Sequence, residues 1–227
     1  MIEECVSFKS EGLLIEGLLS YSDTIETPRA KVLLCPPHPF LGGDMQNNVI
    51  SQLNTALVEQ GYLVLRFNYR GIGNSQSKRN LEADQQAFWN SSRCPEYESE
   101  MHNDCQSALE WLQVQLDQQL PLLVVGYSFG CLPALKMARM ENSITGCALI
   151  SPPLNKWPIP VEDVAFKKPK GLFYSPGDFA CDTDRLQALF ESMSTPKTLW
   201  EIQDADHFFI KKESLLGEQV TDFLAAV

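Results

Sequence analysis

The residues with the clearest capacity for chemistry are Gly126-Tyr127-Ser128-Phe129-Gly130, a Gly-x-Ser-x-Gly pattern. The pattern lies between an apolar, strand-like run at residues 122–125 and a run of helical composition at residues 131–140. A strand that turns sharply into a helix needs those glycines, and such a turn can hold a serine hydroxyl forward in a strained conformation. Such a pattern is weak by itself, but this placement predicts that Ser128 is a nucleophile at the carboxyl edge of a sheet.

A serine hydroxyl needs a general base, and the chain offers three histidines. His207 follows a strand-like run at residues 198–203 and precedes the last helical segment, so a loop could carry its imidazole to Ser128. His102 lies within a helical segment rich in acidic residues, which favours a solvated surface position. His38 lies in the loop after the strand-like run 31–35, where we expect it to shape the loop. The sequence therefore predicts His207 as the base, with activity falling at acid pH as it protonates, because histidine ordinarily titrates near pH ~6.5.

The base in turn needs a carboxylate that fixes its tautomer, and this should follow an intervening strand. Asp178 comes directly after the run 171–175 and is the favoured acid. Asp182 and Asp184 compete with it, although Asp184 is better explained as a partner of the next helix N-terminus. The resulting order of Ser, Asp and His along the chain is that of α/β-hydrolases rather than of trypsin-like or subtilisin-like enzymes.

An oxyanion intermediate needs two N–H donors. The first would be the backbone N–H of Phe129, the residue after the nucleophile. The second should come from the loop after residues 31–35, where the prolines of Pro36-Pro37-His38-Pro39 have no N–H to give. We therefore expect Phe40 or Leu41 to supply the second donor.

The elements that must position these residues alternate along the chain. Two strand-like runs, 5–10 and 13–21, flank a turn and predict an antiparallel hairpin. Strand-like and helical segments then alternate to the end, which predicts a mainly parallel, twisted sheet with helices on both faces. Two segments break the rhythm: the polar run 75–100, expected to be a long loop or minimal lid, and the proline-rich run 151–170, expected to be a loop.

Composition narrows the class of protein. With 227 residues, 44% of them apolar, we expect a single domain over residues 1–227. The net charge of −11 argues against nucleic-acid binding. Seven cysteines without Cys-x-x-Cys pairs suggest reduced thiols in a cytoplasmic protein. The start of the chain has no signal-peptide pattern and no apolar run approaches a membrane span, so we expect no membrane partner.

Taken together, these motifs resemble a family: the small, lidless α/β-hydrolases related to dienelactone-hydrolase-like and acyl-peptidase-like serine hydrolases. The resemblance rests, in order, on PPHPFLGGDMQNN, FNYRGIGNS, GYSFG, SPGDFACD and DADHFF, which span most of the chain. It implies that Asp178, not Asp182, is the acid. The chain departs from the family pattern at Pro36, Ser175 and Asp204, and in a longer loop after Ser75, which bear on loop geometry and substrate choice.

These features predict a serine hydrolase that cleaves an ester or thioester of a small-molecule acyl substrate through an acyl-enzyme, with no metal or cofactor. A peptidase or amidase of the same fold, and a catalytically silent binding protein, are the alternatives. A dinucleotide site at RGIGNS is disfavoured because Gln76 replaces the third glycine. The sequence does not fix the oligomeric state. Five loop aromatics could wall the acyl pocket, although each could equally be an ordinary core residue: Phe40, Trp89, Phe129, Phe179 and Phe208. A basic cluster of Lys167, Lys168 and Lys170 could meet an anionic leaving group, although a solvated loop explains the lysines more simply.

Overall fold

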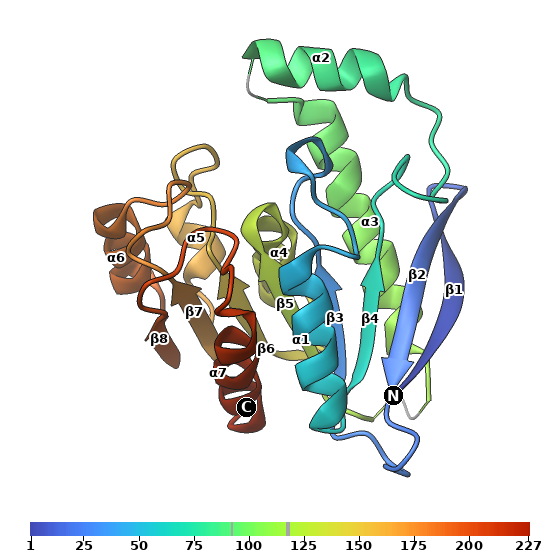
Figure 1. Cartoon of the computed structure of the whole chain (residues 1–227), viewed down its shortest axis with the longest axis vertical. Coiled ribbons are helices and arrows are strands. Elements are labelled where there is room, and N and C mark those ends of the chain that lie inside the picture. Colours follow the sequence, from blue (N-terminus) through green and yellow to red (C-terminus); the bar gives the residue numbers. More distant parts are fainter. Residues whose placement is uncertain (92, 117–118) are drawn as a thin grey trace.

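A single eight-stranded sheet organises the computed structural model, which describes residues 1–91, 93–116 and 119–227. The strand order is β1-β2-β4-β3-β5-β6-β7-β8 (Figure 1). The hairpin expected at the start forms from β1 (Ile2–Ser10) and β2 (Leu13–Tyr21), which pair antiparallel. Strand β2 then joins the rest of the sheet by an antiparallel pairing with β4.

The other strands are parallel to one another, as the alternation of segments predicts. Most of these strands are short runs of apolar residues with both faces buried, because helices cover the sheet on each side. Their carboxyl ends consequently meet at one edge. The strands are β3 (Lys31–Cys35), β4 (Leu63–Phe67), β5 (Leu122–Tyr127), β6 (Ile144–Ile150), β7 (Lys170–Tyr174) and β8 (Lys197–Glu201).

Two groups of helices form the outer layers. Helices α1 (Asn48–Glu59) and α7 (Glu213–Ala225) pack side by side on one face, where they close one hydrophobic core. The other face is covered by α3 (Pro95–Gln113) and α4 (Cys131–Met140), together with the smaller α5 (Val161–Val164) and α6 (Thr183–Ser192). The sheet thus separates two cores, as expected for a sheet with helices on both faces.

The expectation of a loop over residues 75–100 is wrong in part. Residues 81–91 form helix α2 (Leu81–Ser91), and α3 already begins at Pro95. Figure 1 shows α2 lying across the end of the molecule at which the parallel strands finish. The helix escapes sequence analysis because only Phe88 of its side chains is buried, so the segment carries almost no helical hydrophobic period.

The proline-rich run 151–170 is irregular apart from the single turn of α5, in agreement with the expected loop. Within the described ranges, no helix combines the length and the apolar character needed to cross a membrane. All seven cysteines are free thiols, and all except Cys5 are buried.

Candidate active site

The turn between β5 and α4 holds Ser128 in a left-handed conformation, with φ of 52°. A Cβ atom at Gly126 would lie 2.3 Å from the carbonyl oxygen of Gly130, and one at Gly130 would lie 2.1 Å from that of Cys35. Neither position can therefore carry a side chain. The two glycines let the strand turn at once into a short 3₁₀ helix (Ser128–Gly130) that leads into α4, which is the geometry expected of a nucleophile elbow.

The structure brings the three side chains singled out in the sequence together at the carboxyl edge of the sheet. Ser128 Oγ lies 3.1 Å from Nε2 of His207, and Nδ1 of His207 lies 2.8 and 3.0 Å from the two carboxylate oxygens of Asp178. Because a carboxylate only accepts, Nδ1 carries the proton and donates it to Asp178. Nε2 is left free to accept from the serine hydroxyl. All three residues are about 95% buried.

The loops that carry the acid and the base are fastened to each other and to the elbow. Ser175 Oγ donates to the carbonyl of Ala205 over 2.5 Å, and the backbone at Gly177 approaches the same carbonyl closely. The Tyr127 hydroxyl donates to the carbonyl of His207 over 2.9 Å. These contacts fix the position of His207 from two sides. Ser175 contributes one of them, at a position where the family that the sequence resembles has glycine.

The competing carboxylates lie elsewhere. Asp182 precedes α6 and accepts from the side-chain amide of Asn155 over 3.1 Å. Asp184 lies in the first turn of α6, where a carboxylate favours the positive end of the helix dipole. Of these aspartates, only Asp178 contacts His207 in the described structure.

The candidate oxyanion donors differ in whether their N–H groups already have a hydrogen-bond acceptor. Phe129 lies in the first turn of the short helix that follows the strand, where N–H groups lack an intrahelical acceptor. The N–H of Phe40 donates to Nδ1 of His38 over 3.2 Å, and that of Leu41 donates to the carbonyl of His38 over 3.0 Å. To bind an oxyanion, the N–H of Phe40 or Leu41 must therefore give up its present acceptor or share its hydrogen between two acceptors.

The two remaining histidines both lie against aromatic rings, His38 fully buried and His102 half-buried. His38 is fully buried and stacks on Phe88 at 4.6 Å, as its predicted role in shaping the loop allows. Burial lowers its pKa to about 3, although the Glu98 carboxylate opposes the shift. The expectation that His102 is solvated is wrong: its ring lies 5.9 Å from that of Phe129, and burial lowers its pKa to about 4. Neither histidine contacts Ser128.

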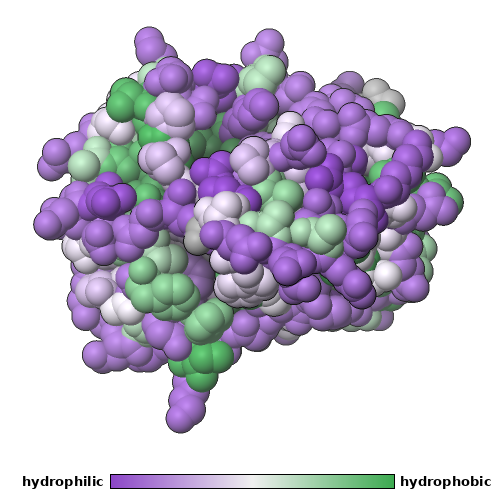
Figure 2. Space-filling view, turned by 90° about the horizontal axis from the view of Figure 1, so that it is seen from above, coloured by the Kyte–Doolittle hydropathy of each residue, from purple (hydrophilic) through white to green (hydrophobic). Residues whose placement is uncertain are grey.

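A cleft of about 350 Å³ opens over Ser128 and His207. Trp157, Phe179 and Phe208 give it apolar walls, and the last two flank His207 with ring centroids 5.0 and 5.6 Å away. Figure 2 looks onto this end of the molecule, where hydrophobic patches lie among hydrophilic side chains. Sequence analysis missed the cleft residues of two loops, because nothing in an irregular segment shows which side chains face the site: Asn47, Asn155, Lys156 and Trp157.

Other candidates from the sequence lie outside the cleft. Phe40 and Phe129 belong to the core, and Trp89 is exposed on α2. The lysine cluster lies at the start of β7, at the opposite edge of the sheet from Ser128, so it cannot meet a leaving group there. Lys168 and Lys170 are not simply solvated either. The ammonium group of Lys168 donates to two carbonyls at the end of α4, and that of Lys170 donates to two carbonyls of the segment just before β7.

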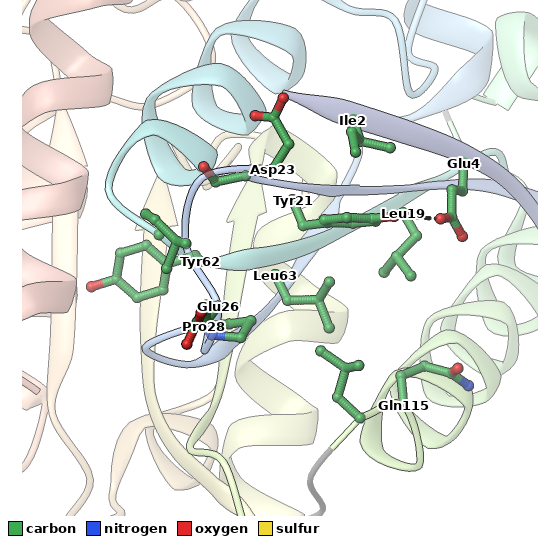
Figure 3. A pocket seen from close by; sticks show the side chains of 14 residues that line it. Ile2, Glu4, Leu19, Tyr21, Asp23, Glu26, Pro28, Tyr62, Leu63 and Gln115 are labelled. Carbon is green, nitrogen blue, oxygen red and sulfur yellow. Dashed lines mark hydrogen bonds between the residues drawn. The ribbon is translucent and has the colours of Figure 1, made fainter.

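A larger hollow of about 530 Å³ lies far from the site. It is formed by the hairpin, the loop after it and the start of β4, and therefore lies at the amino ends of the parallel strands (Figure 3). Carboxylates such as Glu4 and Asp23 face it, but it contains no pair of nucleophile and base. Among the described residues, no three side chains of the metal-binding types gather into a site.

The family model that describes the alpha/beta hydrolase fold matches residues 32–180, about two thirds of the chain. The chain belongs to the α/β-hydrolase family. An uncharacterised protein of Rickettsia prowazekii is 28% identical over 222 residues, which cover 94% of this chain and 85% of that protein. Two solved structures illustrate how the fold of this chain is shared by other proteins.

One is an α/β serine hydrolase homologue from Coxiella burnetii, with a TM-score of 0.80, 22% identity and coverage of 96% of both chains. The other, from Xanthomonas campestris, is described as an α/β serine hydrolase without a lid; it has a TM-score of 0.79 and 20% identity, and covers 99% of this chain and 94% of its own. At these identities, the likeness shows a common fold.

Proposed function

We propose that this protein is a serine hydrolase that cleaves a carboxylic ester or thioester through an acyl-enzyme. One observation carries the proposal: the Oγ of Ser128, on a strained turn, lies 3.1 Å from a histidine whose other nitrogen is fixed by a buried aspartate. Such an arrangement activates a hydroxyl that is otherwise a poor nucleophile. The strain at Ser128 supports the same interpretation, since a packing role would not require it.

In the first half of the reaction, Ser128 Oγ attacks the carbonyl carbon while His207 Nε2 takes its proton. The resulting imidazolium is stabilised by Asp178, and it then gives the proton to the departing alcohol or thiol. In the second half, His207 takes a proton from water, the hydroxide attacks the acyl carbon, and the proton returns to Ser128. Hydroxyl, imidazole and carboxylate supply every proton transfer, so the proposal includes no metal or cofactor.

The negative charge on the attacked oxygen requires donors beside Ser128. The N–H of Phe129 is the first, and we assign the second to Phe40 or Leu41 in the loop after β3. Each donor of this kind typically contributes about 10²- to 10³-fold to the rate. Phe40 and Leu41 now donate to His38 within the same loop, over 3.2 and 3.0 Å. The substrate oxygen would then compete with His38 for one of these N–H groups.

The lining of the cleft favours a neutral, largely apolar acyl group. The described lining residues include aromatic and amide side chains and one lysine but no carboxylate, and Asp178 lies behind His207. A suitable test is a panel of 4-nitrophenyl esters, thioesters and 4-nitroanilides of matched acyl groups. We expect the protein to hydrolyse the esters or thioesters with kcat/KM at least tenfold above the anilides. Ser128→Ala should lower the rate by about 10⁴-fold.

Faster cleavage of the anilides would instead identify an amidase. Equal rates for the parent protein and Ser128→Ala, in two samples with the same circular dichroism, would contradict hydrolysis at this serine.

A further inference from the structure

Helix α2 is attached to the rest of the molecule by very few contacts. Phe88 is its only buried side chain, whereas its neighbour Trp89 is 61% exposed. At the beginning of the helix, Leu81 is half-buried against the same core as Phe88, and Asp84 forms an ion pair with Arg79. A helix with one buried ring has less to lose on moving than α1, α3 or α4, each of which buries at least six side chains.

Aromatic rings and one ammonium group surround the ring of Phe88, so its site suits a flat aromatic group. It stacks on His38 at 4.6 Å and lies nearly parallel to Trp157 at 6.5 Å, with an interplanar angle of 22°. Phe40 contacts it edge-on at 5.7 Å. The Lys156 ammonium lies 3.8 Å from the ring centroid, within the range of a cation–π interaction.

One buried donor beside this ring has no acceptor among the described residues. Since the Phe40 N–H donates to Nδ1 of His38, that nitrogen is unprotonated and Nε2 carries the hydrogen. This Nε2–H is buried without a partner, whereas the indole of Trp157 has the Glu98 carboxylate beside it as a hydrogen-bonding partner. Phenylalanine cannot accept the hydrogen of His38, and buried donors without acceptors are rare in proteins.

The place of Phe88 adjoins the cleft above Ser128. Trp157 and Lys156 line that cleft with one side and contact Phe88 with the other. We propose that Phe88 fills the distal acyl subsite of the enzyme, and that an aromatic ring of the substrate takes its place when α2 withdraws. This inference rests on the proposed hydrolase function, whose substrates would be esters of carboxylic acids that end in an aromatic ring.

The chemistry of the surroundings specifies the ring further. A substrate ring in this place stacks on His38 and Trp157 and keeps the contact with the Lys156 ammonium. An oxygen substituent on the ring would accept from His38 Nε2–H, which Phe88 leaves unpaired. We therefore assign to the subsite a hydroxylated or alkoxylated aromatic ring in preference to a plain hydrocarbon.

The first arm of the test is kinetic. For each variant, kcat/KM is measured with 4-nitrophenyl 3-phenylpropanoate and with 4-nitrophenyl acetate, which share a leaving group. Phe88→Ala vacates the subsite and should raise the ratio of the two values about tenfold. Trp89→Ala, on the exposed side of the same helix, should leave the ratio within about twofold. Phe88→Leu, which retains an apolar anchor, should shift the ratio in the same direction if Phe88→Ala does not fold.

The second arm measures binding without turnover. In a Ser128→Ala background, calorimetry with 3-phenylpropanoate should give about tenfold tighter binding for Phe88→Ala than for Trp89→Ala, and 3-(4-hydroxyphenyl)propanoate should bind more tightly than the unsubstituted acid. If Phe88→Ala bound the acids more tightly but no protein with Ser128 intact hydrolysed either ester, the proposed function would be overturned and the subsite would stand. Hydrolysis of the acetate ester with neither the ratio nor the affinity changed would overturn the subsite alone.

Discussion

At the scale of single residues, the identity of the carboxylate behind His207 is the most direct point to test. Asp178→Asn keeps the shape of the side chain but can no longer stabilise the imidazolium or hold the required tautomer. We expect kcat to fall by about 10³- to 10⁴-fold with KM nearly unchanged. Steady-state kinetics with a 4-nitrophenyl ester would measure this.

The matched control is Asp182→Asn, since Asp182 is a solvent-exposed carboxylate four positions along the same loop. That variant should retain the parent activity. If Asp182→Asn lost activity and Asp178→Asn kept it, the assignment of the acid would be wrong.

His38 makes the stability of the protein depend on pH. The pKa of this group is about 3 when folded, against ~6.5 in an unfolded chain, so the unfolded state binds the proton more readily. As pH falls from 7 to 5, the unfolded state gains a proton that the folded His38 does not take up. The free energy of unfolding should therefore fall by about 2 kcal/mol from this group alone.

His38→Asn removes the titration and offers an oxygen that can accept from the Phe40 N–H. Urea unfolding at pH 7 and pH 5 should show that the variant, although less stable overall, loses about 2 kcal/mol less than the parent between the two values. Equal losses for both proteins would contradict the burial of a neutral His38.

The meeting of Ser128, Asp178 and His207 could be predicted from the sequence because each lies within a few residues of the end of a strand, and strand ends are visible as apolar runs that stop. The surroundings of His38 and His102 could not, because the rings that bury them come from segments distant in the chain. The acidic neighbours of His102 pointed to solvent, whereas the helix turns its ring toward Phe129.

At the scale of elements, the turn between β5 and α4 leaves the least room for an added side chain. Gly130→Ala would place a methyl group 2.1 Å from the carbonyl oxygen of Cys35, which belongs to the backbone and cannot rotate away. We expect a loss of about 3 kcal/mol in unfolding free energy, and at least a tenfold loss of kcat/KM because the serine shifts with the turn. Thermal unfolding and ester hydrolysis would measure the two effects.

Gly146→Ala is the corresponding control. An added methyl group there would meet chiefly the side chain of Val227 near the end of the chain, which can move aside. This variant should stay within about 1 kcal/mol of the parent and remain fully active. Similar losses for both variants would mean that the turn has no special constraint.

Helix α2 shows where prediction of elements from sequence fails. A helix is recognised by a repeating apolar face, and α2 buries only Phe88. The strands were easier to place because those of the parallel sheet are buried on both faces and read as continuous apolar runs. The helices that cover them show apolar faces for the same reason, as α1 does.

At the scale of the whole molecule, the alternation of strands and helices is enough to predict the class of fold and the edge at which the reactive residues meet. The order of the strands in the sheet and the walls of the cleft were not predictable in the same way. Asn155, Lys156 and Trp157 enter the site from a proline-rich segment with no periodicity, and only the packing of that segment against the elbow decides which side chains face Ser128.

The proposed function requires that this molecule activates one serine. A fluorophosphonate probe reacts with serines that are activated in this way, and peptide mapping by mass spectrometry identifies the modified residue. We predict that a single equivalent labels the folded protein at Ser128, and that Ser128→Ala and His207→Ala abolish labelling. A folded, monodisperse sample that remains unlabelled, or one that is labelled at another serine, would contradict the account.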